Sequence, residues 1–79
     1  MIENTSLTEA LAHLQAGDWE SAHKIVQADS SKEAAWLHAH LHRVEGDLAN
    51  ARYWYNRAGR DEAKGTLGSE LAELKQALE

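Results

Sequence analysis

The segment 36–59, WLHAHLHRVEGDLANARYWYNRAG, decides the fold that we expect for the rest of the chain. It predicts two antiparallel helices that meet at Gly46 and Asp47. Glycine adopts the left-handed conformation that ends a helix, and an aspartate side chain accepts hydrogen bonds from the free N–H groups that start the next one. The segment therefore predicts a helical hairpin.

The composition predicts an all-α protein. Alanine occurs at 14 of 79 positions and leucine at 10, whereas proline and phenylalanine are absent. Alanine and leucine favour helices, and the chain has few of the β-branched residues from which strands are built. We expect one small domain without disulfides, since there is no cysteine.

Capping patterns and apolar spacing outside the hairpin predict three further helices. Gly17-Asp18 and the Ser30-Ser31 pair are the breaks between them, and Ser69 is the predicted cap of the last helix. The predicted organisation is a helix pair over 7–28, a helix pair over 31–58, a loop over 60–68 and a capping helix over 69–78.

The two predicted helix pairs are related as an internal repeat. At an offset of 29 residues, five identical pairs align, and both turns share the Gly-Asp dipeptide. The aligned pairs are Ala10 with Ala39, His13 with His42, Gly17 with Gly46, Asp18 with Asp47, and Ala22 with Ala51. Repeated helix pairs are typical of stacked helical arrays.

The second unit resembles a tetratricopeptide repeat. Ala39 stands at the small position of the first helix, and Ala51, Tyr55 and Ala58 match the small, aromatic, small row of the second. The resemblance implies a right-handed stack of two helix pairs plus a C-terminal capping helix, without chemistry of its own. Segment 36–59 is also similar to small uncharacterised bacterial proteins, which implies no particular activity.

The tetratricopeptide resemblance further implies a concave groove that binds a protein or peptide. The implied groove residues are Leu7, Leu11, Leu14, Glu33, Trp36, His40, Arg43 and Val44. Three leucines are unusual in an open groove, and we expect the last helix to cover them with its own leucines. A second chain or a bound segment is the alternative.

Charge is unevenly distributed along the chain. The net charge of −5 argues against general affinity for nucleic acid, yet residues 48–60 carry three arginines and no acid. No segment reaches the roughly 20 apolar residues that a membrane span needs, and the N-terminus lacks a leader pattern. We expect a cytoplasmic protein. The basic segment could contact a carboxylate, a phosphate or an acidic partner, and the alternative, which we favour, is that its arginines are solvated or pair with neighbouring acids.

One polar flank of helix 31–45 is the predicted binding surface. Trp36, His40 and Arg43 share this flank, and an aromatic ring beside a guanidinium suits a carboxylate. On the next helix, Trp54 and Arg57 form a second predicted contact. For both tryptophans, packing within the protein is the alternative, against the first or last helix for Trp36 and under the last helix for Trp54.

The opposite flank carries His38, His42 and Glu45 at i, i+4 and i+7. This spacing allows two imidazoles and a carboxylate to bind Zn²⁺. The alternative, which we favour, is a buried network in which the histidines bond to Tyr55, Asn50 or backbone carbonyls. In that case acidification below about pH 6 would lower stability.

Little in the sequence points to catalysis. The serines stand at helix starts, where capping explains them, and no glycine-rich phosphate loop is present. We therefore expect a non-catalytic protein- or peptide-binding module without a cofactor. The alternatives are a metal or histidine-based small-molecule site, and a self-associating structural protein that dimerises through its leucine edges.

Overall fold

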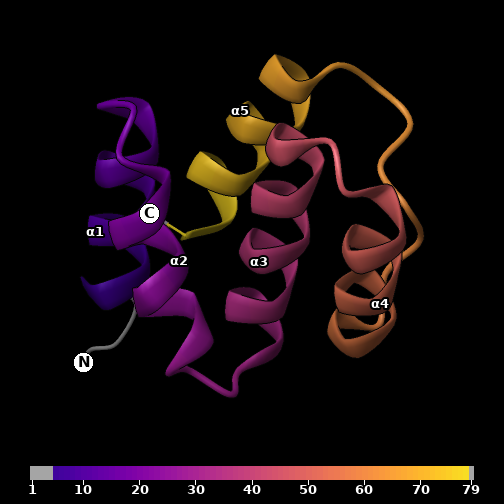
Figure 1. Ribbon diagram of the computed structural model, residues 1–79, viewed down its shortest axis with the longest axis horizontal. Coiled ribbons are helices and arrows are strands. Elements are labelled where there is room, and N and C mark those ends of the chain that lie inside the picture. The colour runs from indigo at the N-terminus through magenta and orange to yellow at the C-terminus, as the bar shows by residue number, and fades with distance from the viewer. Residues whose placement is uncertain (1–4, 79) are drawn as a thin grey trace.

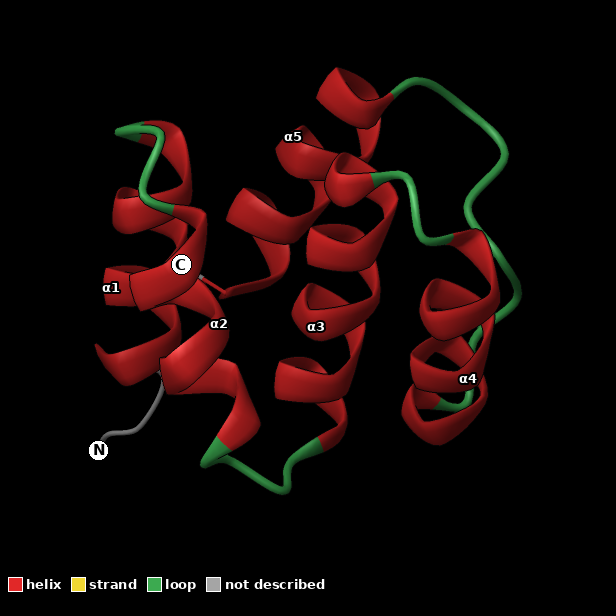
Figure 2. Ribbon diagram, viewed as in Figure 1, coloured by secondary structure: helices red, strands yellow, loops and turns green. Residues whose placement is uncertain are grey.

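The computed structural model describes residues 5–78, which form five α-helices and contain no strand (Figures 1 and 2). The all-α prediction is confirmed for this part of the chain. The first four helices run in alternating directions and are joined by short turns, and a longer loop returns from the end of α4 to the start of α5 (Figure 1). The helices are α1 (Thr5–Gln15), α2 (Trp19–Gln27), α3 (Lys32–Glu45), α4 (Leu48–Ala58) and α5 (Leu67–Leu78).

The predicted turn chemistry is confirmed at both glycine-aspartate breaks. Gly17 and Gly46 have φ angles of 85° and 89°, a region that side chains with a Cβ rarely adopt. Asp18 and Asp47 then cap α2 and α4 by accepting from backbone N–H groups three residues on. Each pair therefore ends one helix and starts the next.

The helix α3 lies at the centre of the fold and contacts α2, α4 and α5. Its residues 34–42 are all buried, a run of nine that covers every side of the helix. Apolar residues lie on two sides of this helix, Leu37 and Leu41 on one and Ala35 and Ala39 on the other, so it needs neighbours on both sides. Three histidines lie within the buried run, so their ring nitrogens need partners inside the protein.

The helix α5 packs against both α1 and α3. Leu7 and Leu11 of α1 and Leu74 and Leu78 of α5 are all buried, so the last helix covers the leucines of the first as expected. In Figure 1, α5 returns from the loop beside α4 to lie between α1 and α3.

Two predicted helix starts were misplaced. The last helix begins at Leu67, because Thr66 rather than Ser69 is its cap: the N–H of Ser69 donates to Thr66 Oγ1 at 3.0 Å. The first helix begins at Thr5, two residues before the predicted start. The observed loop before the last helix therefore ends earlier than the predicted loop over 60–68.

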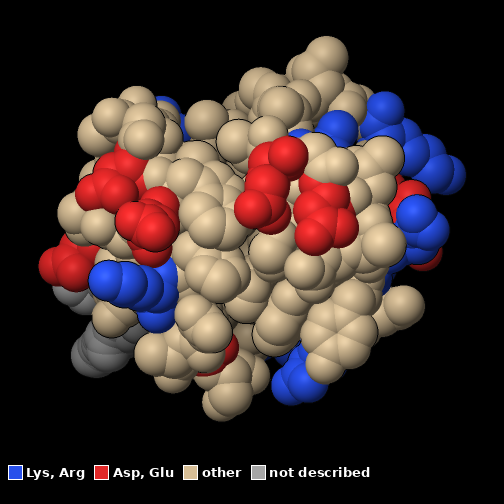
Figure 3. All heavy atoms as spheres, in the orientation of Figure 1, with Lys and Arg blue, Asp and Glu red and all other residues tan. Residues whose placement is uncertain are grey.

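Charge separates on the face shown in Figure 3. Most lysine and arginine side chains in this view lie on the side formed by α4 and the loop before α5. Acidic side chains gather over the other helices. Within residues 5–78, no helix has the length and apolar character required to cross a bilayer.

Candidate functional site

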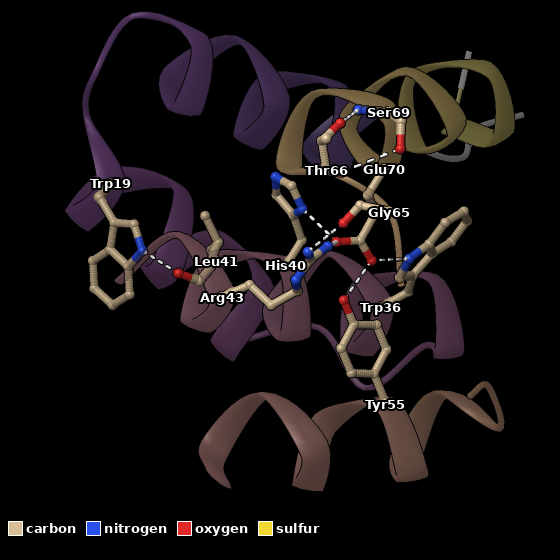
Figure 4. Close-up of polar contacts among 10 residues, drawn as sticks. All are labelled: Trp19, Trp36, His40, Leu41, Arg43, Tyr55, Gly65, Thr66, Ser69 and Glu70. Carbon is tan, nitrogen blue, oxygen red and sulfur yellow. Dashed lines mark hydrogen bonds and ion pairs between the residues drawn. The ribbon is translucent and has the colours of Figure 1, made fainter. Parts of the chain in front are cut away.

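A buried carboxylate is the first site of interest. Trp36 Nε1 and Tyr55 Oη donate hydrogen bonds to Oε2 of Glu70 at 3.0 and 2.5 Å. His40 Nδ1 and Arg43 Nη1 donate to Oε1, each at 2.7 Å (Figure 4). We call these four donors the carboxylate cage. Glu70 is only 2% exposed, so hydrogen bonds from the protein take the place of solvent around its carboxylate.

Helical spacing on three elements explains how the cage forms. Trp36, His40 and Arg43 recur at i, i+4 and i+7 on one flank of α3, and Tyr55 comes from the inner face of α4. Glu70 stands four residues before Leu74 and eight before Leu78, within the stripe that α5 turns inward. Burial of the leucine stripe therefore brings the carboxylate against the donors.

The donors determine the electrostatics of the cage. Burial alone would raise the pKa of Glu70, but the hydrogen bonds from His40, Tyr55, Arg43 and Trp36 outweigh it and lower the pKa to about 2. The pKa of Tyr55 is raised by burial and by its hydrogen bond to Glu70. At neutral pH, Glu70 is therefore an ionised carboxylate held by a neutral phenol.

Two arginines and a cleft lie beside the cage. Arg43 Nη2 also donates to the carbonyl of Gly65 at 2.8 Å, which ties the loop before α5 to α3. The guanidinium of Arg60 lies 3.5 Å from the ring centroid of Trp36. An open cleft of about 400 Å³ is bounded by Trp36, this loop and α5, so solvent reaches the edge of the cage.

The structure brings three of the five predicted binding residues together and separates the other two. Trp36, His40 and Arg43 converge as the sequence indicated, and the group that they hold is a carboxylate of the chain itself. Trp36 and His40 are 6% and 1% exposed. A second carboxylate can therefore reach this flank only when Glu70 leaves it.

Trp54 and Arg57 lie elsewhere and line a different, smaller cleft with residues 27–31. The Arg57 guanidinium lies 5.3 Å from the Trp54 ring centroid. Trp54 is half-buried, and its ring stacks on His38 at a centroid distance of 3.8 Å. The alternative expected for Trp54, packing under α5, is therefore replaced by packing on α3.

A histidine cluster on the opposite flank of α3 is the second site. His38 and His42 of α3 meet His23 of α2, and one ring nitrogen from each lies within 4.8 Å of the others. The Nε2 atoms of His23 and His38 are 3.0 Å apart. His38 and His42 are buried and His23 is half-buried. We call these three residues the histidine cluster.

Aromatic rings hold the histidine cluster on both sides. Trp19 stacks on His23 at a centroid distance of 4.7 Å, and Trp54 stacks on His38. The indole of Trp19 is itself fixed, because its Nε1 donates to the carbonyl of Leu41 at 2.7 Å. The ring planes of the cluster are therefore set by neighbours from α2, α3 and α4.

The partners predicted for this flank were partly wrong. His38 meets His23, and Tyr55 and Asn50 bond elsewhere, to Glu70 and Asp47. The three residues of the predicted metal site, His38, His42 and Glu45, do not form one group of possible ligands. Glu45 accepts from Nδ1 of His42 at 2.9 Å, and it groups with His42 and Asp47, whereas His38 groups with His42 and His23.

Burial keeps part of the histidine cluster neutral. The pKa of His38 is lowered to about 4, first by burial and then by the neighbouring His23 and His42. The pKa of His23 is lowered by burial and by His42. At neutral pH both rings therefore carry a lone pair that can accept a proton or bind a metal.

Sequence reasoning missed one residue in each site. Glu70 was overlooked because an isolated glutamate on a surface helix is ordinary; its signal is a position four residues before Leu74 and eight before Leu78, inside an apolar stripe. His23 was overlooked because the predicted histidine set was taken from helix 31–45 alone. Its signal is the i+4 spacing after Trp19, which places the two rings in contact.

Comparisons with known proteins add little to this geometry. No protein-family model matches the chain, and no solved structure matches it. The chain is 38% identical over 61 residues to the envelope glycoprotein gp160 of simian immunodeficiency virus agm.grivet (isolate AGM gr-1). That match covers 71% of this chain and 7% of the glycoprotein, so the chain spans a small fraction of the relative's length.

Proposed function

We propose that this protein is a small, non-catalytic helical scaffold that binds an amphipathic helix carrying an acidic side chain. The binding surface is the groove between α1 and α3, with Tyr55 of α4 at its edge, and α5 occupies it in the resting protein. A tetratricopeptide-like stack, in which two helix pairs present such a groove, is the arrangement that we propose for the fold.

The observation that supports this proposal is the convergence of four donors on one carboxylate. Trp36, His40 and Arg43 come from the flank that the sequence indicated, and their donors meet at Glu70 of a separate helix. Charge-assisted hydrogen bonds of this kind are specific for an anion and weaken sharply when it is replaced by a neutral group. The groove is thus selective for an acidic residue.

The resident helix also shows which other side chains such a ligand needs. Leu74 and Leu78 of α5 are buried on the same side as Glu70. A helix with an acid and leucines at i+4 and i+8 therefore fits the groove. Binding of an amphipathic helix through anchors spaced by three, four or seven residues is a common recognition mode.

A labelled peptide with the α5 sequence, LGSELAELKQAL, tests the proposal. It is added to the full-length Glu70→Gln protein, whose own α5 has lost its carboxylate while the cage remains. We expect saturable binding by fluorescence anisotropy, and at least tenfold weaker binding of the same peptide with Gln in place of the Glu that corresponds to Glu70. Further substitution of Arg43→Gln in the protein should abolish the preference.

Circular dichroism shows whether Glu70→Gln remains folded. If it does not, the Leu74→Ala protein replaces it, since that change loosens α5 and keeps the cage. Equal binding of the Glu and Gln peptides, or no binding to either protein, would mean that the cage only stabilises the fold. The proposal would then be wrong.

Self-association through leucine edges has less support than peptide binding. Leu7, Leu11, Leu74 and Leu78 are buried within one chain and are not free to join a second copy. The large apolar side chains that the described residues expose lie at other positions: Val44, Leu48, Tyr53 and Leu67.

A further inference from the structure

The histidine cluster is not explained by its hydrogen bonds. His23 and His38 face each other through Nε2 atoms 3.0 Å apart, and two neutral rings can share only one proton there. His38 Nδ1 is buried and has no partner within residues 5–78. A buried polar atom without a partner costs about 1–3 kcal/mol, so hydrogen bonds within the protein do not fully account for the burial of this ring. The nitrogen that faces the other rings is Nε2.

The distances within the cluster suit a metal ion. Ligand nitrogens about 2.0–2.1 Å from a tetrahedral Zn²⁺ are about 3.3 Å from one another. The 3.0 Å separation of the His23 and His38 Nε2 atoms is close to that edge. The third nitrogen, from His42, lies within 4.8 Å of both, a gap that side-chain rotation can close.

We propose that His23, His38 and His42 form a binding site for a divalent transition-metal ion such as Zn²⁺, with water as the fourth ligand. Three imidazoles and an open position are a common zinc arrangement, and nitrogen ligands disfavour Mg²⁺ and Ca²⁺, which prefer oxygen. This inference does not depend on the proposed peptide binding, since the cage and the cluster share no residue.

Surrounding groups already hold the rings as a metal site requires. Glu45 accepts from Nδ1 of His42, which leaves the Nε2 atom of that ring for the metal and increases its basicity. Trp19 and Trp54 fix the planes of His23 and His38 by stacking. His23, half-buried, leaves one side through which an ion can enter.

Titration calorimetry with ZnCl₂ on the full chain at pH 7.5 tests the site, after treatment with chelator and without a histidine tag. We expect one equivalent of Zn²⁺ to bind. The His38→Gln and His23→Gln proteins should each bind at least 100-fold more weakly. The matched control is His13→Gln, because His13 occupies in the first helix pair the repeat position of His42 and is absent from the cluster; it should bind as the wild type does.

Two further measurements separate a built site from adventitious binding. Glu45→Gln, which removes only the partner of His42, should weaken Zn²⁺ binding 10- to 100-fold while the fold is kept. One equivalent of Cu²⁺ should quench the fluorescence of Trp19 and Trp54 in the wild type, and His38→Gln should remove most of that quenching. No saturable uptake by the wild type, or equal loss in His13→Gln, would overturn the proposal.

Discussion

The two flanks of α3 present opposite solutions to the same physical problem. Each flank buries imidazole side chains. A protein of this size has little folding free energy to offset buried polar groups that lack partners. In the carboxylate cage, Glu70 accepts from four donors, and the cage is complete. In the histidine cluster three rings face one another, and Nδ1 of His38 has no partner within residues 5–78.

This difference indicates what each flank can do. A complete network needs nothing from outside the chain, so a ligand there must compete with α5. An incomplete cluster of neutral rings has lone pairs that an external cation can use. The comparison therefore predicts that a ligand of the carboxylate cage must displace α5. A cation can bind to the histidine cluster without displacing any part of the protein.

The largest expected effect comes from removal of the carboxylate. Glu70→Ala leaves Arg43 and the other three donors without their acceptor, and we expect the free energy of unfolding to fall by about 3–5 kcal/mol. Urea denaturation followed by circular dichroism measures this. The control is Glu73→Ala, an exposed position on the same helix, which should change stability by less than about 0.5 kcal/mol. Similar losses in the two variants would contradict a central role for Glu70.

The two flanks should also lose stability in different pH ranges in the metal-free protein. The pKa of His38 is lowered from 6.5 to about 4, so the unfolded chain binds more protons between these values and stability falls as the pH drops through them. The pKa of Glu70 is lowered from 4.5 to about 2, so its contribution is present above pH 4.5 and is lost as the pH falls towards 2.

We expect the free energy of unfolding to fall by roughly 1–3 kcal/mol across each pH range, since one pKa unit corresponds to about 1.4 kcal/mol. Urea denaturation at a series of pH values measures both losses. His38→Gln should remove the upper range alone, and Glu70→Gln the lower one alone. A wild-type stability that is equal at pH 5.5 and 7.5 would contradict the lowered pKa of His38.

A smaller loss is expected when one donor of the cage is removed. Tyr55→Phe deletes the hydroxyl that donates to Glu70, and hydrogen bonds to charged groups contribute about 1.5–3 kcal/mol. The matched change Tyr53→Phe removes an exposed hydroxyl on the same helix and should have little effect. If thermal unfolding shows equal losses of stability for Tyr55→Phe and Tyr53→Phe, the hydrogen bond from Tyr55 to Glu70 does not stabilise the protein.

The smallest expected effect comes from the turn that anchors both flanks. The N–H of Gly46 donates to the carbonyl of Arg43, and the N–H of Asp47 donates to the carbonyl of His42. One turn therefore holds the backbone of a cage residue and of a histidine-cluster residue. A Cβ at Gly46 meets no atom within 4 Å, and Gly46→Ala should cost only the backbone strain of φ 89°, about 1 kcal/mol. Gly68→Ala, within α5, should not destabilise the protein. Chemical denaturation of both variants checks this.

The sequence predicted the helices well because their ends are chemically marked. Gly46 and Asp47 dictate a helix end and a helix start whatever packs around them, and the same holds at Gly17 and Asp18. The central place of α3 was also predictable, since apolar residues on two faces require neighbours on both sides.

The sites were less predictable, because they depend on contacts between residues far apart in the chain. The donors Trp36, His40 and Arg43 were recognised as a carboxylate-binding flank, but Glu70 lies 27 or more residues away, across a loop whose path local rules do not determine. His23 joins His38 only through the packing of α2 on α3. Spacing along one helix shows which residues share a face, and not which helix covers that face.

The central claim is that the cage is complete and the histidine cluster is open, and ¹⁵N NMR of the imidazole rings tests it most directly. One equivalent of ZnCl₂ at pH 7.5 is added to the full-length protein labelled at its histidines. We expect the ring signals of His23, His38 and His42 to move in slow exchange, while His40 keeps its Nδ1 proton and its shift. Unmoved cluster signals, or an equal change at His40, would contradict the account.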